Sequence, residues 1–128
     1  MIDRSSWFLR AHNDEVRPFT VAVSCPCAGV SVCTPTGEVD AFTSSLLREQ
    51  LVTATAEARH LVIDLSGVTF FSAAGAEVLM AARAGQQGRG ALVLACPPRP
   101  VQIVLDILSL THLFCRSDDV DAAVATCA

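Results

Sequence analysis

Short stretches of alternating or continuous apolar residues predict five β-strands along the chain. They cover residues 19–23, 30–34, 61–66, 91–95 and 113–115. Pro26 and Gly29 mark a turn between the first two, which predicts a hairpin, and Pro35 indicates that the second strand ends there or runs along a sheet edge. The runs at 61–66 and 91–95 are typical of central strands that are buried on both faces.

The segments between and after these strands repeat apolar residues with the period of an α-helix. In the first helix this period is carried by Leu47, Leu51, Ala54 and Ala58. That helix is expected to begin at Asp40, which can cap it with Thr43 at the third helical position. The second is expected to begin at Ser72, the third to cover residues 101–108, and the last to follow Asp118.

The order β-β-α-β-α-β-α-β-α predicts one α/β domain built on a single mixed sheet. Strands that alternate with helices after residue 40 imply parallel central strands packed with helices, joined by right-handed crossovers. The hairpin adds an antiparallel pair at the N-terminal side. We assign residues 18–128 to this domain and residues 1–17, which show no clear period, to an N-terminal lead-in segment.

Composition excludes several classes of function. The 128 residues are 52% hydrophobic and 17% charged, which suits one folded domain with a substantial core. The nine basic residues are all Arg and are scattered, and the net charge is −4, so no nucleic-acid partner is expected. Apolar stretches are too short for a membrane helix and the N-terminus does not resemble a secretory signal. We therefore expect a cytoplasmic protein without membrane insertion.

Six cysteines are expected to be reduced thiols, mostly used as small apolar residues. Their spacing does not fit a zinc site, so neither a metal nor another cofactor is expected. One pair suggests a redox function, because Cys96 follows one central strand and Cys115 lies in the next. If their Cα atoms lie within about 7 Å, oxidation could join them and alter partner binding. Six unconnected thiols are the alternative.

Functional groups of an open α/β sheet collect outside the carboxyl ends of its strands. This rule indicates three places: the segment after Thr34, the turn 67–75 and the segment after Ala95. In the turn, small residues follow Ser72 at the start of a helix, where free backbone N–H groups attract an anion or a partner carboxylate. The alternative is an ordinary helix cap with Ser72 at its first position.

Residues 60–75, HLVIDLSGVTFFSAAG, resemble the signature of the STAS family, which is named after sulfate transporters and anti-sigma factor antagonists. Its usual form is an apolar strand, Asp-Leu-Ser-x-Val-x-Phe, then Asp-Ser-Ser/Thr-Gly-Leu opening a helix. Residues 36–40, TGEVD, are similar to the family's Gly-Glu-Leu/Ile-Asp element, and residues 105–114 and 119–123 are similar to its closing elements. The matches run in order from about Phe19 to the end, so the resemblance implies the STAS fold.

The resemblance also implies a function in partner binding. Stand-alone bacterial members bind an anti-sigma factor, often a serine kinase, and so free a sigma factor. Phosphorylation of the Ser immediately after the motif's Asp ends that binding. On this basis the partner surface comprises the loop 37–40 and the start of the second helix, with the residues Gly37, Glu38, Asp40, Ser72, Ala73, Ala74, Gly75, Ala76 and Glu77.

Two departures from the motif concern regulation. Ser72 stands at the motif's Asp position, and Ala73 stands where the phosphoacceptor Ser would be; Ala76 also replaces the usual Leu. Alanine has no hydroxyl, so this position cannot gain the roughly −1.5 to −2 charge of a phosphate. Three interpretations stay open: a constitutive antagonist, a displaced phosphosite at Ser72, and a domain that only scaffolds a larger assembly.

Two further functions are alternatives to an anti-sigma factor antagonist. One is a non-phosphorylatable STAS subunit of a lipid-transport or stress-sensing complex. The other is an enzyme that uses Ser72, which would need a base or paired carboxylates nearby. No His or Lys lies near Ser72 in the sequence, and there is no P-loop or dinucleotide-binding motif, so we assign no catalytic residue. Homodimer formation is left open.

Overall fold

The computed structural model describes residues 18–127. Its elements are β1 (Thr20–Cys27), β2 (Val30–Val39), α2 (Thr43–Glu57), β3 (His60–Asp64), β4 (Gly67–Phe71), α3 (Ala73–Gln86), β5 (Leu92–Ala95), α4 (Arg99–Ile107), a 3-10 turn (Thr111–Leu113), β6 (Cys115–Ser117) and α5 (Val120–Cys127). None of the helices in this part of the chain is long and apolar enough to cross a membrane.

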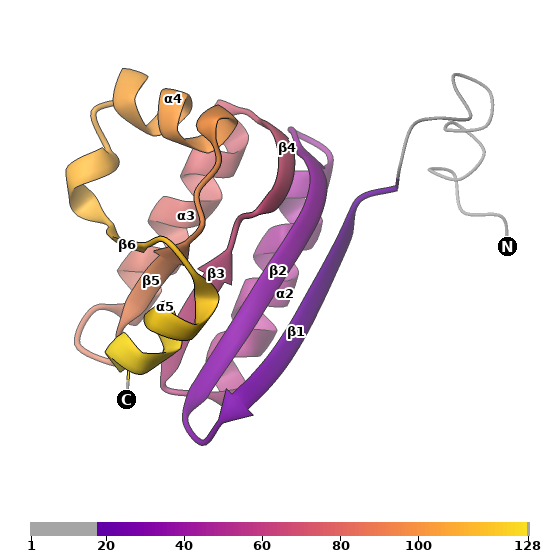
Figure 1. Cartoon of the computed structure of the whole chain (residues 1–128). Helices are drawn as coiled ribbons and strands as arrows, with labels where there is room; N and C mark the ends of the chain where they lie inside the picture. The colour runs from indigo at the N-terminus through magenta and orange to yellow at the C-terminus, as the bar shows by residue number, and fades with distance from the viewer. Residues whose placement is uncertain (1–17, 128) are drawn as a thin grey trace, which may run out of the picture.

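All six strands belong to one mixed sheet (Figure 1). The strand order is β1-β2-β3-β5-β6, and β4 pairs with β2. β1 and β2 are antiparallel, whereas every other pair is parallel. The predicted fold class, a mixed sheet with an antiparallel N-terminal hairpin and parallel central strands, is therefore confirmed.

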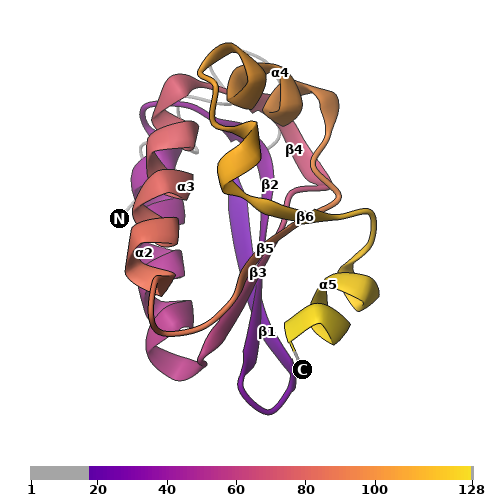
Figure 2. The same ribbon diagram turned by 90° about the vertical axis from the view of Figure 1, so that its left-hand side faces the viewer.

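Helices cover both faces of this sheet and create two apolar layers (Figure 2). α2 and α3 lie on one face and α5 lies on the other, while α4 lies at the end where the parallel strands finish. In β3, Leu61 and Ile63 point into the larger core under α2 and α3, and Val62 points into the smaller core under α5. Coverage on both faces explains why the β3 segment is a continuous apolar run.

β2 is longer than predicted, because it continues through Pro35 to Val39. It pairs with β3 over residues 30–33 and with β4 over residues 36–39. Pro35 lies between these two sets of pairs, where the strand changes its parallel partner, and it is paired with Val21 of β1 on the other side. The prediction that the strand ends at Pro35 or forms a sheet edge is therefore wrong.

The sequence predicts a strand at 61–66 followed by a turn at 67–75, whereas the structure forms two strands there, β3 and β4. After Asp64 the chain turns: the Ser66 N–H donates to Asp64 Oδ1 at 3.0 Å. β4 then moves beside β2 with one extra residue, since Gly37 pairs with Val68 and Glu38 pairs with Phe70. Such a β-bulge re-aims the side chains beyond it. The last strand is also displaced, to residues 115–117, because a 3-10 turn occupies 111–113.

Candidate functional site

Two of the predicted functional segments meet at the end of the sheet where α2 and α3 begin (Figure 1). The last pair of the β2–β4 ladder joins Val39 to Phe71, so the residues that follow each strand are neighbours. The backbone N–H of Ser72 donates to the Val39 carbonyl at 3.0 Å. The segment predicted as a loop, residues 37–40, is the end of β2 together with Asp40, and it lies beside the turn that begins at Ser72. We keep the name loop 37–40 for this segment.

Asp40 caps the start of α2. Its Oδ1 accepts hydrogen bonds from the backbone N–H groups of Phe42 and Thr43, both at 2.9 Å. Thr43 Oγ1 in turn accepts from the Asp40 N–H at 2.9 Å and donates to the Glu38 carbonyl at 2.6 Å. The cap interpretation of Asp40 and Thr43 is confirmed, and the reciprocal bonds fix the conformation of the loop.

Gly37 is favoured by its backbone conformation alone, since a side chain there would have room. Its φ is +113°, which L side chains rarely adopt, and a Cβ there would lie 3.4 Å from Cα of Phe19. Glu38, the next residue, has an exposed side chain at the end of β2. Gly37 therefore shapes the loop, and Glu38 is the residue of this pair whose side chain can contact a partner.

Ser72 occupies the N-cap position of α3 through its backbone. Its φ and ψ are −107° and 176°, and its carbonyl accepts from Gly75 at 3.0 Å and from Ala76 at 3.2 Å. Its side chain makes no cap hydrogen bond, and within residues 18–127 the buried Oγ has no hydrogen-bond partner. The cap position is as predicted, but a kinase could not reach this hydroxyl without opening the turn.

We predict that Ser72→Ala leaves the free energy of unfolding unchanged or raises it by up to about 1 kcal/mol. A serine whose hydroxyl caps a helix loses about 1 kcal/mol on this change. Here the substitution removes a buried hydroxyl that lacks a partner, which relieves a desolvation penalty instead. Urea unfolding of the two proteins measures the difference, and a clear loss of stability would show that Oγ is hydrogen-bonded after all.

The remaining candidates on α3 divide between surface and core. Ala73 and Glu77 are exposed, and Ala74 is half-buried. Gly75 and Ala76 are buried, with Ala76 in the core under α2 and α3. The exposed residues can contact a partner, whereas the two buried ones position the helix.

Gly75 allows α3 to pack closely on the end of β4. A Cβ at this position would lie 2.6 Å from the ring of Phe71, which is itself buried. Gly85 lies in the same helix, and a Cβ there would meet nothing within 4 Å. The two glycines can therefore be compared directly: packing excludes a side chain at position 75 and leaves room for one at position 85.

We predict that Gly75→Ala lowers the free energy of unfolding by about 1–3 kcal/mol, because the added methyl overpacks the Phe71 ring. Gly85→Ala should instead raise it by about 0.5–1 kcal/mol, since alanine favours the helix. Thermal or urea unfolding of both variants checks this contrast. Equal gains in the two variants would mean that Phe71 does not restrict position 75.

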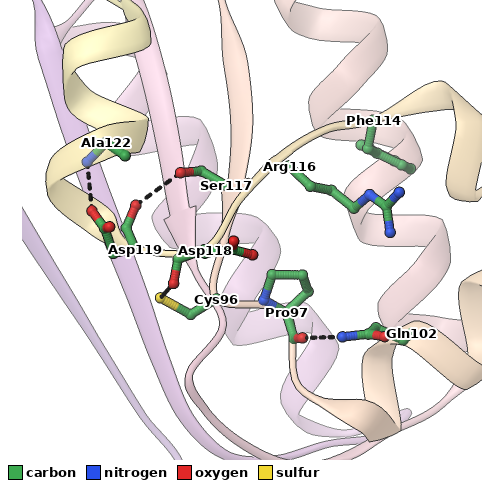
Figure 3. A pocket seen from close by; sticks show the side chains of 9 residues that line it. All are labelled: Cys96, Pro97, Gln102, Phe114, Arg116, Ser117, Asp118, Asp119 and Ala122. Atoms are coloured by element: carbon green, nitrogen blue, oxygen red, sulfur yellow. Dashed lines mark hydrogen bonds between the residues drawn. The ribbon is translucent and has the colours of Figure 1, made fainter.

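The third predicted place, the segment after Ala95, borders a hollow of about 900 Å³ (Figure 3). It is lined by Cys96, Pro97, Gln102, Phe114, Arg116, Ser117, Asp118, Asp119 and Ala122. The lining contains no His or Lys that could act as a base, and Ser117 Oγ donates to the Asp119 carbonyl at 3.1 Å. Across residues 18–127, no group of three or more His, Cys, Asp or Glu side chains could hold a metal ion.

Cys96, directly after β5 and at the edge of this hollow, is hydrogen-bonded to the end of β6 and to the residue that follows it. Its N–H donates to the Ser117 carbonyl at 2.8 Å and its Sγ donates to the Asp118 carbonyl at 3.3 Å (Figure 3). Burial raises the pKa of this thiol, and the carboxylates of Asp64, Asp119 and Asp118 raise it further. The thiol therefore stays protonated at neutral pH and is a poor nucleophile.

The structure does not bring Cys96 and Cys115 together. β5 and β6 are neighbours as predicted, but Cys115 pairs with Val93, three residues before Cys96. Three residues of strand span about 10 Å, beyond the roughly 7 Å between Cα atoms that a disulfide allows. The predicted redox pair is wrong in this register, and all six cysteines are free.

Two functional candidates at this end of the sheet were missed by the sequence analysis. Phe42, directly before α2, is 89% exposed, and Leu46, in its first turn, is 50% exposed. Only one signal could have found them: both fall off the helical face that carries Leu47 and Leu51.

Comparison with known proteins identifies the fold that carries this site. The model of the STAS domain matches residues 28–126. The chain belongs to the STAS family. An anti-sigma factor antagonist from Mycobacterium paratuberculosis superposes on this STAS domain with a TM-score of 0.78 at 24% identity, over 86% of this chain and 94% of that one. No curated protein matches the sequence.

Two further solved structures are forms of one protein, SpoIIAA. The anti-sigma factor antagonist SpoIIAA in its unphosphorylated form gives a TM-score of 0.70 at 14% identity, over 84% of this chain and 96% of that one. The Bacillus cell fate determinant SpoIIAA in the phosphorylated form gives 0.67 at 14% identity, over 84% and 98%. At these identities the likeness establishes that this STAS domain shares their fold.

Proposed function

We propose that this STAS domain is an anti-sigma factor antagonist of the binding type, without catalysis of its own. It binds an anti-sigma factor of the serine-kinase class and thereby releases a sigma factor for transcription. The observation that carries this proposal is the pairing of the loop 37–40 with the exposed start of α3 at one end of the sheet. The solved anti-sigma factor antagonists with the same fold support it.

We further propose that phosphorylation at the motif position does not control this antagonist. Ala73 is the first residue of α3 and is exposed, so a partner kinase could reach it but would find no hydroxyl. The Ser72 hydroxyl beside it is buried. The complex would then be limited by the amounts of the two proteins, or by a signal at another place, and not by a phosphate at the start of α3.

A pull-down from the native lysate, with the purified domain as bait, tests the function. Captured proteins are identified by mass spectrometry and then incubated with labelled ATP. We expect an anti-sigma factor with a kinase domain that binds the bait and does not label it. If the lysate contains an anti-sigma factor of this kind and the bait is recovered without it, the proposal is contradicted.

The missing hydroxyl also favours a second candidate function. A STAS subunit that scaffolds a lipid-transport or stress-sensing complex has no need of a phosphoacceptor at Ala73. In that case the same pull-down would recover a transporter ATPase or an assembly of several STAS proteins. The identity of the captured proteins therefore separates the two functions.

A further inference from the structure

Two apolar side chains at the start of α2 form an exposed face beside the loop 37–40. Phe42 has helical φ and ψ of −76° and −53°, so Leu46, four residues later, lies on the same face one turn further along. Phe42 is 89% exposed and Leu46 is 50% exposed. Neither packs in the two apolar cores, so the fold itself does not require them.

The backbone of Phe42 is fixed by the cap of α2. Its N–H donates to Asp40 Oδ1 at 2.9 Å, and the same oxygen holds the N–H of Thr43. A side chain on a fixed backbone loses less conformational entropy when a partner buries it. Aromatic residues presented in this way are enriched in the buried centres of protein interfaces.

Single exposed apolar residues are common on soluble proteins, so charge and position decide what this pair does. Glu49 is exposed on the same face of α2, three residues beyond Leu46, and Glu38 is exposed at the end of β2. Arg48, the one basic residue of α2, lies about 100° around the helix from Glu49. The apolar face therefore has an acidic rim, which fits a basic protein surface and disfavours an anionic membrane.

We infer that Phe42 and Leu46 are the apolar anchor for the anti-sigma factor, and that this partner receives them in an apolar pocket with a basic rim. The inference rests on the proposed function and extends its surface from the two predicted segments onto the first turn of α2. Burying a phenylalanine side chain contributes about 1.5–3 kcal/mol. Its loss should therefore weaken the complex by about 10- to 150-fold.

The test compares the dissociation constants of the captured anti-sigma factor for the unchanged domain, two serine variants and one charge variant. Phe42→Ser should weaken binding by 10-fold or more. Val52→Ser, a matched control on the same helix at a position that is 64% exposed, should change it less than twofold. Urea unfolding should be similar for the unchanged domain and the two serine variants, since both positions lie outside the cores. Glu49→Gln should reduce both the affinity and its dependence on salt.

The outcomes separate this inference from the proposed function. Equal affinity of Phe42→Ser and the unchanged domain would overturn the inference and leave the antagonist function standing. Failure of any anti-sigma factor to bind the unchanged domain would overturn both. Loss of binding in Phe42→Ser but not in Val52→Ser supports both.

Experiments on the domain alone show whether this face is instead covered by a second copy of the domain or by residues 1–17. A dimer in light scattering that becomes a monomer in Phe42→Ser would assign the face to a second copy and overturn the inference. Trp7 is the only tryptophan, so its emission reports on the lead-in segment. A red shift of that emission in Phe42→Ser would assign the face to residues 1–17 and equally overturn it.

Discussion

Ala73→Ser should turn the domain into a substrate of its anti-sigma kinase and, once phosphorylated, into a protein that no longer binds it. The substitution adds a hydroxyl at an exposed position at the start of α3. The phosphate would add about −1.5 to −2 charge there and would have to be desolvated at the interface. We expect labelling close to one phosphate per chain, against none for the unchanged domain, and at least a 100-fold loss of affinity after labelling.

The matched control for this prediction is Ala74→Ser, which places a hydroxyl one residue further along and half-buried. It should not be labelled, and it should bind with or without ATP. Without ATP, Ala73→Ser should bind like the unchanged domain, which separates the effect of the phosphate from that of the hydroxyl. Label on the unchanged domain would contradict the proposal that Ala73 removes this form of control.

The second large effect concerns alkaline pH. Cys33 lies in the core with no exposed surface, and burial raises the pKa of its thiol from 9.0 to about 12. Between these values the unfolded chain has lost the proton and the folded chain keeps it, so stability falls as pH rises above about 9. The loss amounts to about 1.4 kcal/mol per pH unit, or about 4 kcal/mol by pH 12.

Urea unfolding between pH 8 and pH 11 measures this effect with no contribution from Lys or Tyr. The chain has no Lys and no Tyr, so between pH 9 and pH 12 its cysteines are the side chains that titrate. Cys33→Ala should flatten the dependence, and Cys25→Ala, which removes an exposed thiol, should leave it unchanged. An identical slope in Cys33→Ala would exclude the buried thiol as the cause. Burial also raises the pKa values of Cys96 and Cys127, so some slope should remain.

The sequence predicts the central sheet well, because burial on two faces leaves a direct signature. Leu61 to Ile63 are apolar at every position since the two sheet faces are both covered. The break between β3 and β4 is marked by Ser66 and Gly67, a dipeptide typical of turns. That a second strand follows this turn is not predicted, because β4 is defined by its pairing with the extended end of β2.

The wrong predictions for Pro35 and for the Cys96–Cys115 pair both come from strand pairing. Pro35 indicates an end or an edge when a strand is considered alone, but β2 changes partner there, and this is a property of three strands together. The position of Cys115 relative to Cys96 likewise depends on how β6 aligns with β5. Pairing register is set by distant packing, so spacing along the chain does not determine it.

The motif resemblance located the two segments of the candidate site, residues 37–40 and the start of α3. The structure then showed which residues of these segments are exposed and which are buried. The capping function of Asp40 was predictable from Thr43 three residues later, because this spacing is a local signature. The direction of the Ser72 hydroxyl was not, since it depends on a rotamer chosen by the surrounding packing. Phe42 was missed because its only signal is indirect, a position off the helical face that carries Leu47 and Leu51.

Because β2 changes partner along its length, the central sheet and the binding end are aligned by different strands. Residues 30–33 are aligned by β3, whereas residues 36–39 are aligned by β4, with a bulge of their own. Glu38, whose side chain is exposed, is therefore aligned by a strand that takes no part in the β3–β5–β6 ladders. Substitutions at exposed positions of this end can change the partner surface while the central pairs stay in place, provided that Val68 and Phe71 of β4 keep their positions in the core.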